Sequence, residues 1–453
     1  MILLAFPLLV ALGDHSGTSL ATSGPHNGTA FSKLRQTSPP DPANGICDGG
    51  VRQLHGYLDG EGNVKLFYWF FESRTNPTTS PTLVYFQGGP GASSMLSAVS
   101  GNGGPCILNE DGTSTSVNQY SWNTFANVMY IDQPASVGFS KGTPPTNSME
   151  AGKSTAKVLE AFFSAHPEYN TEVFLAGQSF AGHYVPAILV ELMNQKSKIN
   201  VEGIALGNPF IAPDFHYGND PDMAFKSGTA PSVVSEATYN KMKAGLKTCL
   251  PLVATCNKNP QGHASCLTAY STCTQLLVDP IVAAGRDEFD LRRSCRPSEC
   301  YDYSSFEKYF NTPDVQQYLG VSAKWTVTNL AVNHGFLTDI ARRYNSLLIP
   351  ALNAGKRVFV FAGDQDYSAN WIGNRAWLLN LKWDGLAGYK SAKTMPFELP
   401  GGEQVGKLKT FTLRPGGGQL SFLQVYAAGH SAARDSPASV QKAMSDFVGN
   451  KLR

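Results

Sequence analysis

The sequence predicts an α/β fold in which helices flank a mostly parallel sheet. Two observations carry this prediction. Short apolar runs end abruptly in Gly, Pro or Asp, as buried strands do where they leave a core. Segments with the helical spacing of apolar residues separate these runs. Alternating strands and helices are typical of parallel sheets covered on both faces.

Five apolar runs are the expected strands. They occupy residues 83–86, 128–131, 173–176, 357–362 and 420–426. Helical spacing is found between them, for example over residues 151–163 and 184–193. Loops rich in Gly, Asp, Ser or His follow most of the strands directly. Because ligands bind beyond the carboxyl ends of parallel strands, we expect the functional side chains to gather at one edge of the sheet.

The composition bounds the function. With 453 residues, 42% of them hydrophobic, the chain can form one large α/β domain with an insertion, or two domains. Its formal net charge of +1 provides no electrostatic surface for nucleic acid or anionic lipid. We therefore expect a peptide or small acyl substrate, without nucleic acid and without a membrane span.

The N-terminal region indicates export. Residues 2–12 form an apolar run of signal-peptide length, too short to cross a membrane. We predict a signal peptide over residues 1–21 and localisation outside the cell or within the secretory and vacuolar pathway. The run lacks a Lys or Arg after Met1, so a buried N-terminal segment is the alternative. Residues 22–45 predict a flexible lead-in with an N-glycosylation site at Asn27.

Eight cysteines, six of them between residues 249 and 300, suggest disulfides in an oxidising compartment. A zinc site is the alternative, but the cluster has no Cys-x-x-Cys pair and only His263 nearby. We expect neither metal nor organic cofactor. Residues 212–320 break the strand–helix alternation, which predicts an inserted, cysteine-rich, partly helical cap between core segments 46–211 and 321–453.

The strand at 173–176 runs into Gly-Gln-Ser-Phe-Ala-Gly and then into a helix. This context is typical of a nucleophile elbow, in which flanking glycines permit a strained turn that exposes the hydroxyl of Ser179. Serine needs an imidazole base and a carboxylate that orients the base. The expected chain order is Ser, acid, His, and His430 is the one histidine after Asp366.

Two assignments stay open at this level. The acid is either Asp364 or Asp366, because both follow the strand at 357–362. His183 is a rival base, but its place one turn along the elbow helix predicts a packing role. The Gly-rich loop at 87–91 can aim a backbone N–H at an oxyanion. A phosphate-binding loop is disfavoured, because no Lys-Ser/Thr follows it and Pro90 lacks a donor.

These residues together resemble the serine carboxypeptidases and carboxypeptidase-like proteins, which have the α/β-hydrolase fold. The matching segments are QGGPGASS (87–94), NGGPC (102–106), DQPASVGFS (132–140), GQSFAGHY (177–184), GNP (207–209), NTPDVQQYLGV (311–321), AGDQDYSANWIGNRAW (362–377) and AGHS (428–431). The resemblance implies that Ser179 is the nucleophile, Asp366 the acid and His430 the base. It also implies that the backbone N–H groups of Gly89 and Phe180 form the oxyanion hole.

The chain departs from the family where a substrate's terminal carboxylate is usually bound. Gln87 replaces an Asn, and Gln178 and Asn102 stand where the family usually has Glu. In the usual site two carboxyl groups share a proton, which links binding to acidic pH. Ser431 stands on the leaving-group side. We predict that these four residues bind the substrate and that the three amides among them line the carboxylate site. Ala92 replaces a common family Cys, so Cys47 or Cys106 needs another partner.

Three functions are compatible with this pattern. The main prediction is a secreted serine-type carboxypeptidase that releases C-terminal residues through an acyl-enzyme on Ser179. Amide N–H groups can donate to a carboxylate at any pH, so such an enzyme would lack the usual acid dependence. The alternative is an acyltransferase or esterase of the same family, because both share the acyl-enzyme step. The second alternative is a non-catalytic binding protein.

Overall fold

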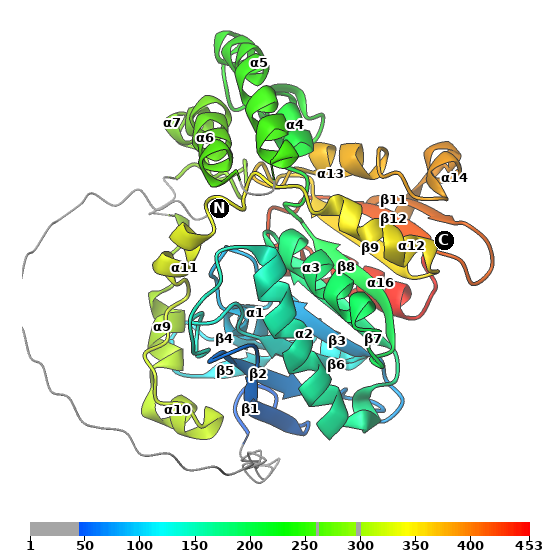
Figure 1. Ribbon diagram of the computed structural model, residues 1–453. Coiled ribbons are helices and arrows are strands. Elements are labelled where there is room, and N and C mark those ends of the chain that lie inside the picture. The colour runs from blue at the N-terminus through cyan, green and yellow to red at the C-terminus, as the bar shows by residue number, and fades with distance from the viewer. Residues whose placement is uncertain (1–44, 260–261, 296–299) are drawn as a thin grey trace, which may run out of the picture.

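The computed structural model describes residues 45–259, 262–295 and 300–453. The predicted signal peptide, nearly all of the lead-in and Asn27 lie outside this part of the chain. Within it, ten strands form one sheet in the order β1-β2-β6-β3-β7-β8-β9-β12-β11-β10 (Figure 1). None of the described helices is long and apolar enough to cross a membrane.

The centre of the sheet is parallel. Its strands are β6 (Asn127–Ile131), β3 (Thr82–Phe86), β7 (Val173–Gln178), β8 (Val201–Gly207), β9 (Arg357–Gly363) and β12 (Gln419–Val425). Nearly every residue of these strands is buried, as expected for parallel strands covered on both faces. All five strands predicted from the sequence are among them, so the prediction of a mostly parallel sheet is confirmed.

Antiparallel strands complete both edges of the sheet. They are β1 (Gln53–Asp59) and β2 (Lys65–Phe71) at one edge, and β11 (Gln404–Thr412) and β10 (Thr394–Glu398) at the other. A separate two-stranded ribbon joins β4 (Cys106–Leu108) to β5 (Thr115–Val117).

Helices cover both faces of the sheet and enclose two hydrophobic clusters. Helices α2 (Ser148–Ala165) and α3 (Ala181–Asn194) lie together on the face nearer the viewer in Figure 1. Phe162 and Val185 pack there, whereas Val440 and Phe447 of α16 (Pro437–Val448) belong to the opposite cluster. Shorter helices complete the layers: α1 (Ser94–Val99), α12 (Ile349–Asn353), α13 (Trp371–Leu378), α14 (Leu386–Ser391) and α15 (Ala432–Asp435).

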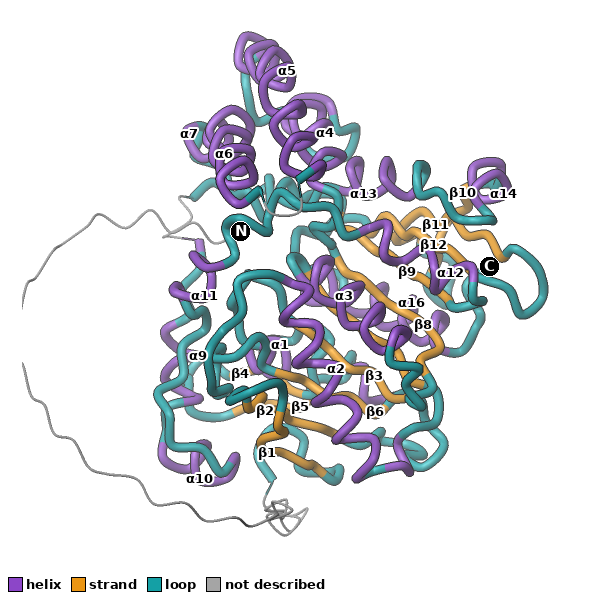
Figure 2. Tube along the Cα trace, in the orientation of Figure 1, coloured by secondary structure: helices purple, strands orange, loops and turns teal. Residues whose placement is uncertain are grey.

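Between β8 and β9 the described chain contributes helices and loops but no strand to the sheet (Figure 2). Ahead of α12, the described α-helices of this stretch are α4 (Pro213–Lys226), α5 (Glu236–Lys258), α6 (His263–Cys273), α7 (Asp279–Ala283), α9 (Ser304–Phe310), α10 (Pro313–Leu319) and α11 (Leu330–Gly335). Helices α4 to α7 form a group that projects from one end of the sheet (Figure 1). An inserted, partly helical segment therefore interrupts the core, as the sequence predicts.

All eight cysteines form disulfides. The pairs are Cys47–Cys106, Cys249–Cys273, Cys256–Cys266 and Cys295–Cys300. Two of these bonds join α5 to α6 and thereby hold the insert together. Asp287 lies near Cys295 and Cys300, but a disulfide is not a thiolate ligand for a metal ion. Because Ala92 stands where the family commonly has a cysteine, Cys47 and Cys106 needed other partners. They pair with each other.

Candidate active site

Ser179 lies on a sharp turn between β7 and α3. Its φ angle is +61°, in the left-handed region that a non-glycine residue rarely adopts. Close packing requires glycine on both sides of it. A Cβ at Gly177 would lie 2.7 Å from the Cβ of Ala181, and one at Gly182 would lie 2.8 Å from the backbone oxygen of Phe210. This geometry is that of a nucleophile elbow, which holds a serine hydroxyl clear of its strand.

His430 follows β12 and contacts Asp366, which follows β9. The Nδ1 of His430 donates to Oδ2 of Asp366 over 2.8 Å. The same carboxylate oxygen accepts a hydrogen bond of 2.8 Å from Asn208 Nδ2, and Asp366 is completely buried. A hydrogen bond at Nδ1 orients the imidazole and leaves Nε2 free to act as a base. Asp364 instead accepts a hydrogen bond from the side chain of Gln365.

Part of the insert supports the histidine loop. The backbone N–H of His430 donates to the carbonyl oxygen of Phe289 over 2.8 Å. The ring of Phe289 also packs on the imidazole, with ring centroids 4.9 Å apart. The segment between α7 and α9 therefore supports the loop of His430.

His183 lies away from these groups. Its ring nitrogens are 2.7 Å from the carbonyl oxygen of Phe210 and 3.0 Å from that of Arg342. Burial lowers the pKa of this imidazole, which is completely enclosed. Stacking on Phe180, with ring centroids 4.2 Å apart, adds to this packing role, as the sequence suggests.

One cleft brings most of the predicted site residues together. This main cleft is lined by Gln87, Gly89, Asn102, Gln178, Ser179, His430 and Ser431. Aromatic side chains from the insert form an aromatic part of its wall: Phe289, Tyr301, Tyr303 and Phe306. Asp366 lies behind His430, and Phe180 lines a second, smaller pocket that also reaches Ser179 and Gly89. The sequence motifs contain no signal for the aromatic wall, because only the folded insert carries it to the cleft.

The Gly-rich loop packs directly against the elbow. A Cβ at Gly88 would lie 2.5 Å from the backbone nitrogen of Phe180 and 2.7 Å from the carbonyl oxygen of Gln178. Only glycine fits such an approach. The φ angle of Gly89 is +109°, which also favours glycine. The loop therefore places Gly89 beside Ser179, where both residues line the main cleft and the smaller pocket.

The three amides of the main cleft are held by hydrogen bonds from within the protein. Asn102 Nδ2 donates to Oε1 of Gln178, and Gln178 Nε2 donates to the carbonyl oxygen of His430 over 3.0 Å. Tyr85 and Ser97 donate to Oε1 of Gln87, each over 2.8 Å. Burial raises the pKa of Tyr85, so its hydroxyl stays a donor. Both glutamine oxygens are thus occupied from within the protein.

These contacts decide what the amides present to a ligand. The oxygen of Gln87 is held by Tyr85 and Ser97, and its NH₂ group makes no hydrogen bond within the described residues. Asn102 and Gln178 each use one N–H, which leaves each a second. The group therefore offers N–H donors, and no negative charge, to the cleft beside Ser179.

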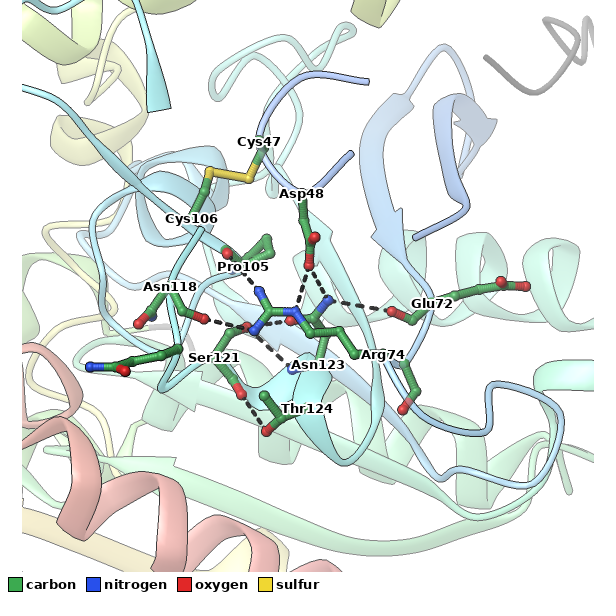
Figure 3. Close-up of polar contacts among 12 residues, drawn as sticks. Cys47, Asp48, Glu72, Arg74, Pro105, Cys106, Asn118, Ser121, Asn123 and Thr124 are labelled. Carbon is green, nitrogen blue, oxygen red and sulfur yellow. Dashed lines mark hydrogen bonds and ion pairs between the residues drawn. A yellow bond between two sulfur atoms is a disulfide. The ribbon is translucent and has the colours of Figure 1, made fainter. Parts of the chain in front are cut away.

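The loop that carries Asn102 is anchored by Arg74 (Figure 3). The guanidinium donates to the carbonyl oxygens of Asn118 and Pro105 over 2.8 and 3.0 Å, and to Asp48 over 2.7 Å. The disulfide Cys47–Cys106 ties the same loop to the start of the described chain. Charge-assisted hydrogen bonds from one guanidinium to several partners fix their surroundings, so this cluster holds the loop of Asn102 in place.

Comparison with known proteins agrees with this geometry. The sequence pattern described as serine carboxypeptidase matches residues 46–450. "Carboxypeptidase Y homolog A" of Sordaria macrospora is 33% identical over 412 residues, covering 88% of this chain and 73% of that protein. The protein of the same name from Chaetomium globosum is 36% identical over 409 residues, covering 88% and 72%.

The chain belongs to the serine carboxypeptidase family. It is accordingly a serine hydrolase, and the resemblance found in the sequence is confirmed. Among solved structures, the prohormone-processing carboxypeptidase Kex1Δp of Saccharomyces cerevisiae is similar, with a TM-score of 0.76 and 22% identity. The match covers 91% of this chain and 94% of that one, which confirms the α/β-hydrolase fold.

Proposed function

We propose that this protein is a serine carboxypeptidase that binds the terminal carboxylate of a peptide through uncharged amides. Ser179 is the nucleophile, His430 the base and later the acid, and Asp366 the group that orients His430. The observation that supports this most strongly is the set of unused N–H donors on Gln87, Asn102 and Gln178 in the main cleft.

In the proposed reaction Ser179 Oγ attacks the last peptide carbonyl while Nε2 of His430 takes the hydroxyl proton. The backbone N–H groups of Gly89 and Phe180 stabilise the oxyanion of the tetrahedral intermediate. Asp366 stabilises the imidazolium across the Nδ1 hydrogen bond. His430 then gives its proton to the leaving amine, and the C–N bond breaks. Water attacks the acyl-enzyme by the reverse proton path and releases the shortened peptide.

Gln178 explains why acidic pH is not needed in this scheme. Its Nε2 donates to the carbonyl oxygen of His430 over 3.0 Å. A Glu there could make this contact only when protonated, because an ionised carboxylate has no donor. Gln donates at every pH. The amide thus keeps both the histidine loop and the carboxylate site in one state across the pH range.

Export through the secretory pathway, to the outside of the cell or to a vacuole, is part of this proposal. Four disulfides, which use every cysteine of the chain, support it, because disulfides persist in oxidising compartments. We also propose residues 212–320 as the cap, between core segments 46–211 and 321–453.

The proposal is tested with a pair of blocked dipeptides that differ only in a free or amidated C-terminus. We expect the free acid to be preferred, and Gln87→Met to raise its KM about 10- to 100-fold, because a hydrogen bond to a charged group contributes about 1.5–3 kcal/mol. The same substitution should raise the KM of the amidated peptide less. Equal rates on both peptides would favour an esterase or acyltransferase. Product analysis with an added alcohol or amine then detects acyl transfer.

Labelling by a phosphonofluoridate checks the nucleophile separately. We expect a single adduct on Ser179, absent in Ser179→Ala and retained in Ser431→Ala, whose serine lies in the same cleft. A wild-type protein that takes up no label would instead be the non-catalytic alternative.

A further inference from the structure

The smaller pocket at Ser179 contains two carboxyl groups that the proposed reaction does not use. This inner pocket is lined by Gly89, Ser179, Phe180 and, deeper in, by Asp220 and Glu288. Asp220 lies on α4 and is 3% exposed, and Glu288 lies between α7 and α9 and is 6% exposed. Two distant parts of the insert therefore bring their acids to the same cavity.

Within the described part of the chain these acids have few polar partners. Asp220 accepts one hydrogen bond, of 2.9 Å, from Asn370 Nδ2. The Glu288 carboxyl has no hydrogen bond or ion pair with any described residue, and none of the residues lining the inner pocket is a Lys, Arg or His. Burial and the neighbouring carboxylate raise the pKa of Asp220. A buried carboxyl without a cation is costly in its ionised form, so this arrangement favours a positively charged ligand.

The rest of the wall suits a cation on an apolar stem. Phe210, Tyr217 and Tyr367 line the pocket together with the two acids. Aromatic rings contact the methylene groups of long side chains and attract cations through their faces. The Tyr217 hydroxyl is buried without a hydrogen-bond partner in the described part of the chain, and it can accept a donor from a guest ammonium.

The position of the pocket identifies the part of the substrate that enters it. The amides that bind the terminal carboxylate lie in the main cleft, so the leaving residue occupies that side of Ser179. The residue whose carbonyl is attacked must lie on the other side. Its side chain then faces the inner pocket, which shares Ser179 and Gly89 with the main cleft.

We infer that Asp220 and Glu288 bind the ammonium or guanidinium of a Lys or Arg at the penultimate position of the peptide. The inner pocket is thus the determinant of specificity, and it selects a basic residue on the acyl side of the bond. This inference rests on the proposed function, because it takes the peptide to be bound with its terminus in the main cleft.

The test compares blocked dipeptides with Lys or norleucine before a C-terminal Ala, since norleucine has the lysine stem without the ammonium. Near neutral pH we expect kcat/KM to favour Lys about tenfold or more. Glu288→Gln and Asp220→Asn should each lower this Lys/norleucine ratio about tenfold, because each removes one charged partner. A ratio at or below one in the wild type, or one that neither variant changes, would overturn the inference.

Asp222→Asn is the matched control. Asp222 lies on α4 two residues from Asp220, but its carboxylate pairs with Lys243 over 3.5 Å and does not line the inner pocket. Its loss should leave the Lys/norleucine ratio unchanged. A fall equal to that of Asp220→Asn would show that the ratio reports the general charge of α4, and would also count against the inference.

Binding to Ser179→Ala gives a second readout if Glu288→Gln does not fold. We expect the Lys peptide to bind about tenfold more tightly than the norleucine peptide, and equal dissociation constants would contradict the inference. Different results would reject the proposed function itself: Ser179 would take up no label, and the protein would show no preference for a free carboxylate. Labelling with that preference, but without a preference for Lys, would reject the inference alone.

Discussion

The two cavities that meet at Ser179 differ in charge. The main cleft presents the amides of Gln87, Asn102 and Gln178, and the inner pocket contains two buried carboxyl groups. This difference in charge matches the group that each cavity is proposed to bind. A terminal carboxylate needs donors without negative charge, and a basic side chain needs acceptors with it. The aspartates that also line the main cleft, Asp290 and Asp435, are paired with arginines. The two acids of the inner pocket have no such partner among the residues that line it.

The largest expected effect removes the group that both cavities share. Ser179→Ala should lower kcat by about 10⁴-fold or more, because the acyl-enzyme cannot form. Binding of a peptide with a free C-terminus should persist, since neither cavity loses a recognition group. Initial rates and calorimetric titration measure the two quantities. Retained turnover would show that Ser179 is not the nucleophile.

Gln178→Glu introduces an acid among the amides of the main cleft. An ionised Glu would face the carbonyl oxygen of His430, now 3.0 Å from a donor, and would repel the substrate carboxylate. We expect kcat/KM on a free-acid peptide to fall about tenfold relative to the wild type between pH 5 and pH 7.5, a difference of about 1.4 kcal/mol. A pH–rate profile identical to that of the wild type would show that Gln178 does not touch the carboxylate.

Binding of a cation in the inner pocket should become stronger as the pH rises. Burial raises the pKa of Glu288 to about 7, and the neighbouring carboxylates of Asp287 and Asp366 act in the same direction, whereas His430 lowers it. Asp220 faces the same carboxyl. Below pH 7 Glu288 is therefore protonated and attracts a cation less, and above it the carboxylate is ionised.

We accordingly expect the Lys/norleucine ratio to rise about threefold to tenfold between pH 5.5 and pH 7.5. The pH dependence of the shared chemical step affects both substrates equally and cancels in this ratio. The rise should disappear in Glu288→Gln. A ratio that falls as the pH increases would contradict the assignment of Glu288 to the cation.

The last prediction concerns the support of the loop that carries Asn102, and it changes stability rather than catalytic rate. The disulfide Cys47–Cys106 spans 59 residues, and replacing both cysteines by Ser should lower the free energy of unfolding by about 4 kcal/mol on the chain-entropy estimate. The matched pair Cys295–Cys300 spans 5 residues and should cost about 2 kcal/mol. Denaturant unfolding measures both changes. A greater loss from the short loop would contradict the entropic account.

The sequence is sufficient for five of the six central strands, because these are buried on both faces and are mostly apolar runs. It misses β8, whose apolar run is interrupted by Glu202 and Gly203. It also misses β10, whose residues are mostly exposed, since pairing with β11 rather than burial defines that strand. The elbow and His430 are predictable because the chemistry fixes residue types and chain order. Disulfide connectivity is not, since eight cysteines allow 105 pairings.

Glu288 and the aromatic wall could not be predicted, because the fold of the insert alone brings them to Ser179. Asp220 has a weak local signal: it lies three and four residues from the buried Tyr217 and Ala224, and therefore on the inner face of α4. A carboxyl on an inner face indicates a partner or a ligand. The sequence alone does not distinguish a protein partner from a ligand, because tertiary contacts determine which groups surround the carboxyl.

The most direct test is the ratio of kcat/KM for one Lys-containing dipeptide with a free and with an amidated C-terminus, measured at about pH 5 and about pH 7.5. A site built on amides predicts that the free acid is preferred by about tenfold or more at both pH values, because no group in it must be protonated. A preference present at pH 5 and lost at pH 7.5, or absent at both, would contradict the account.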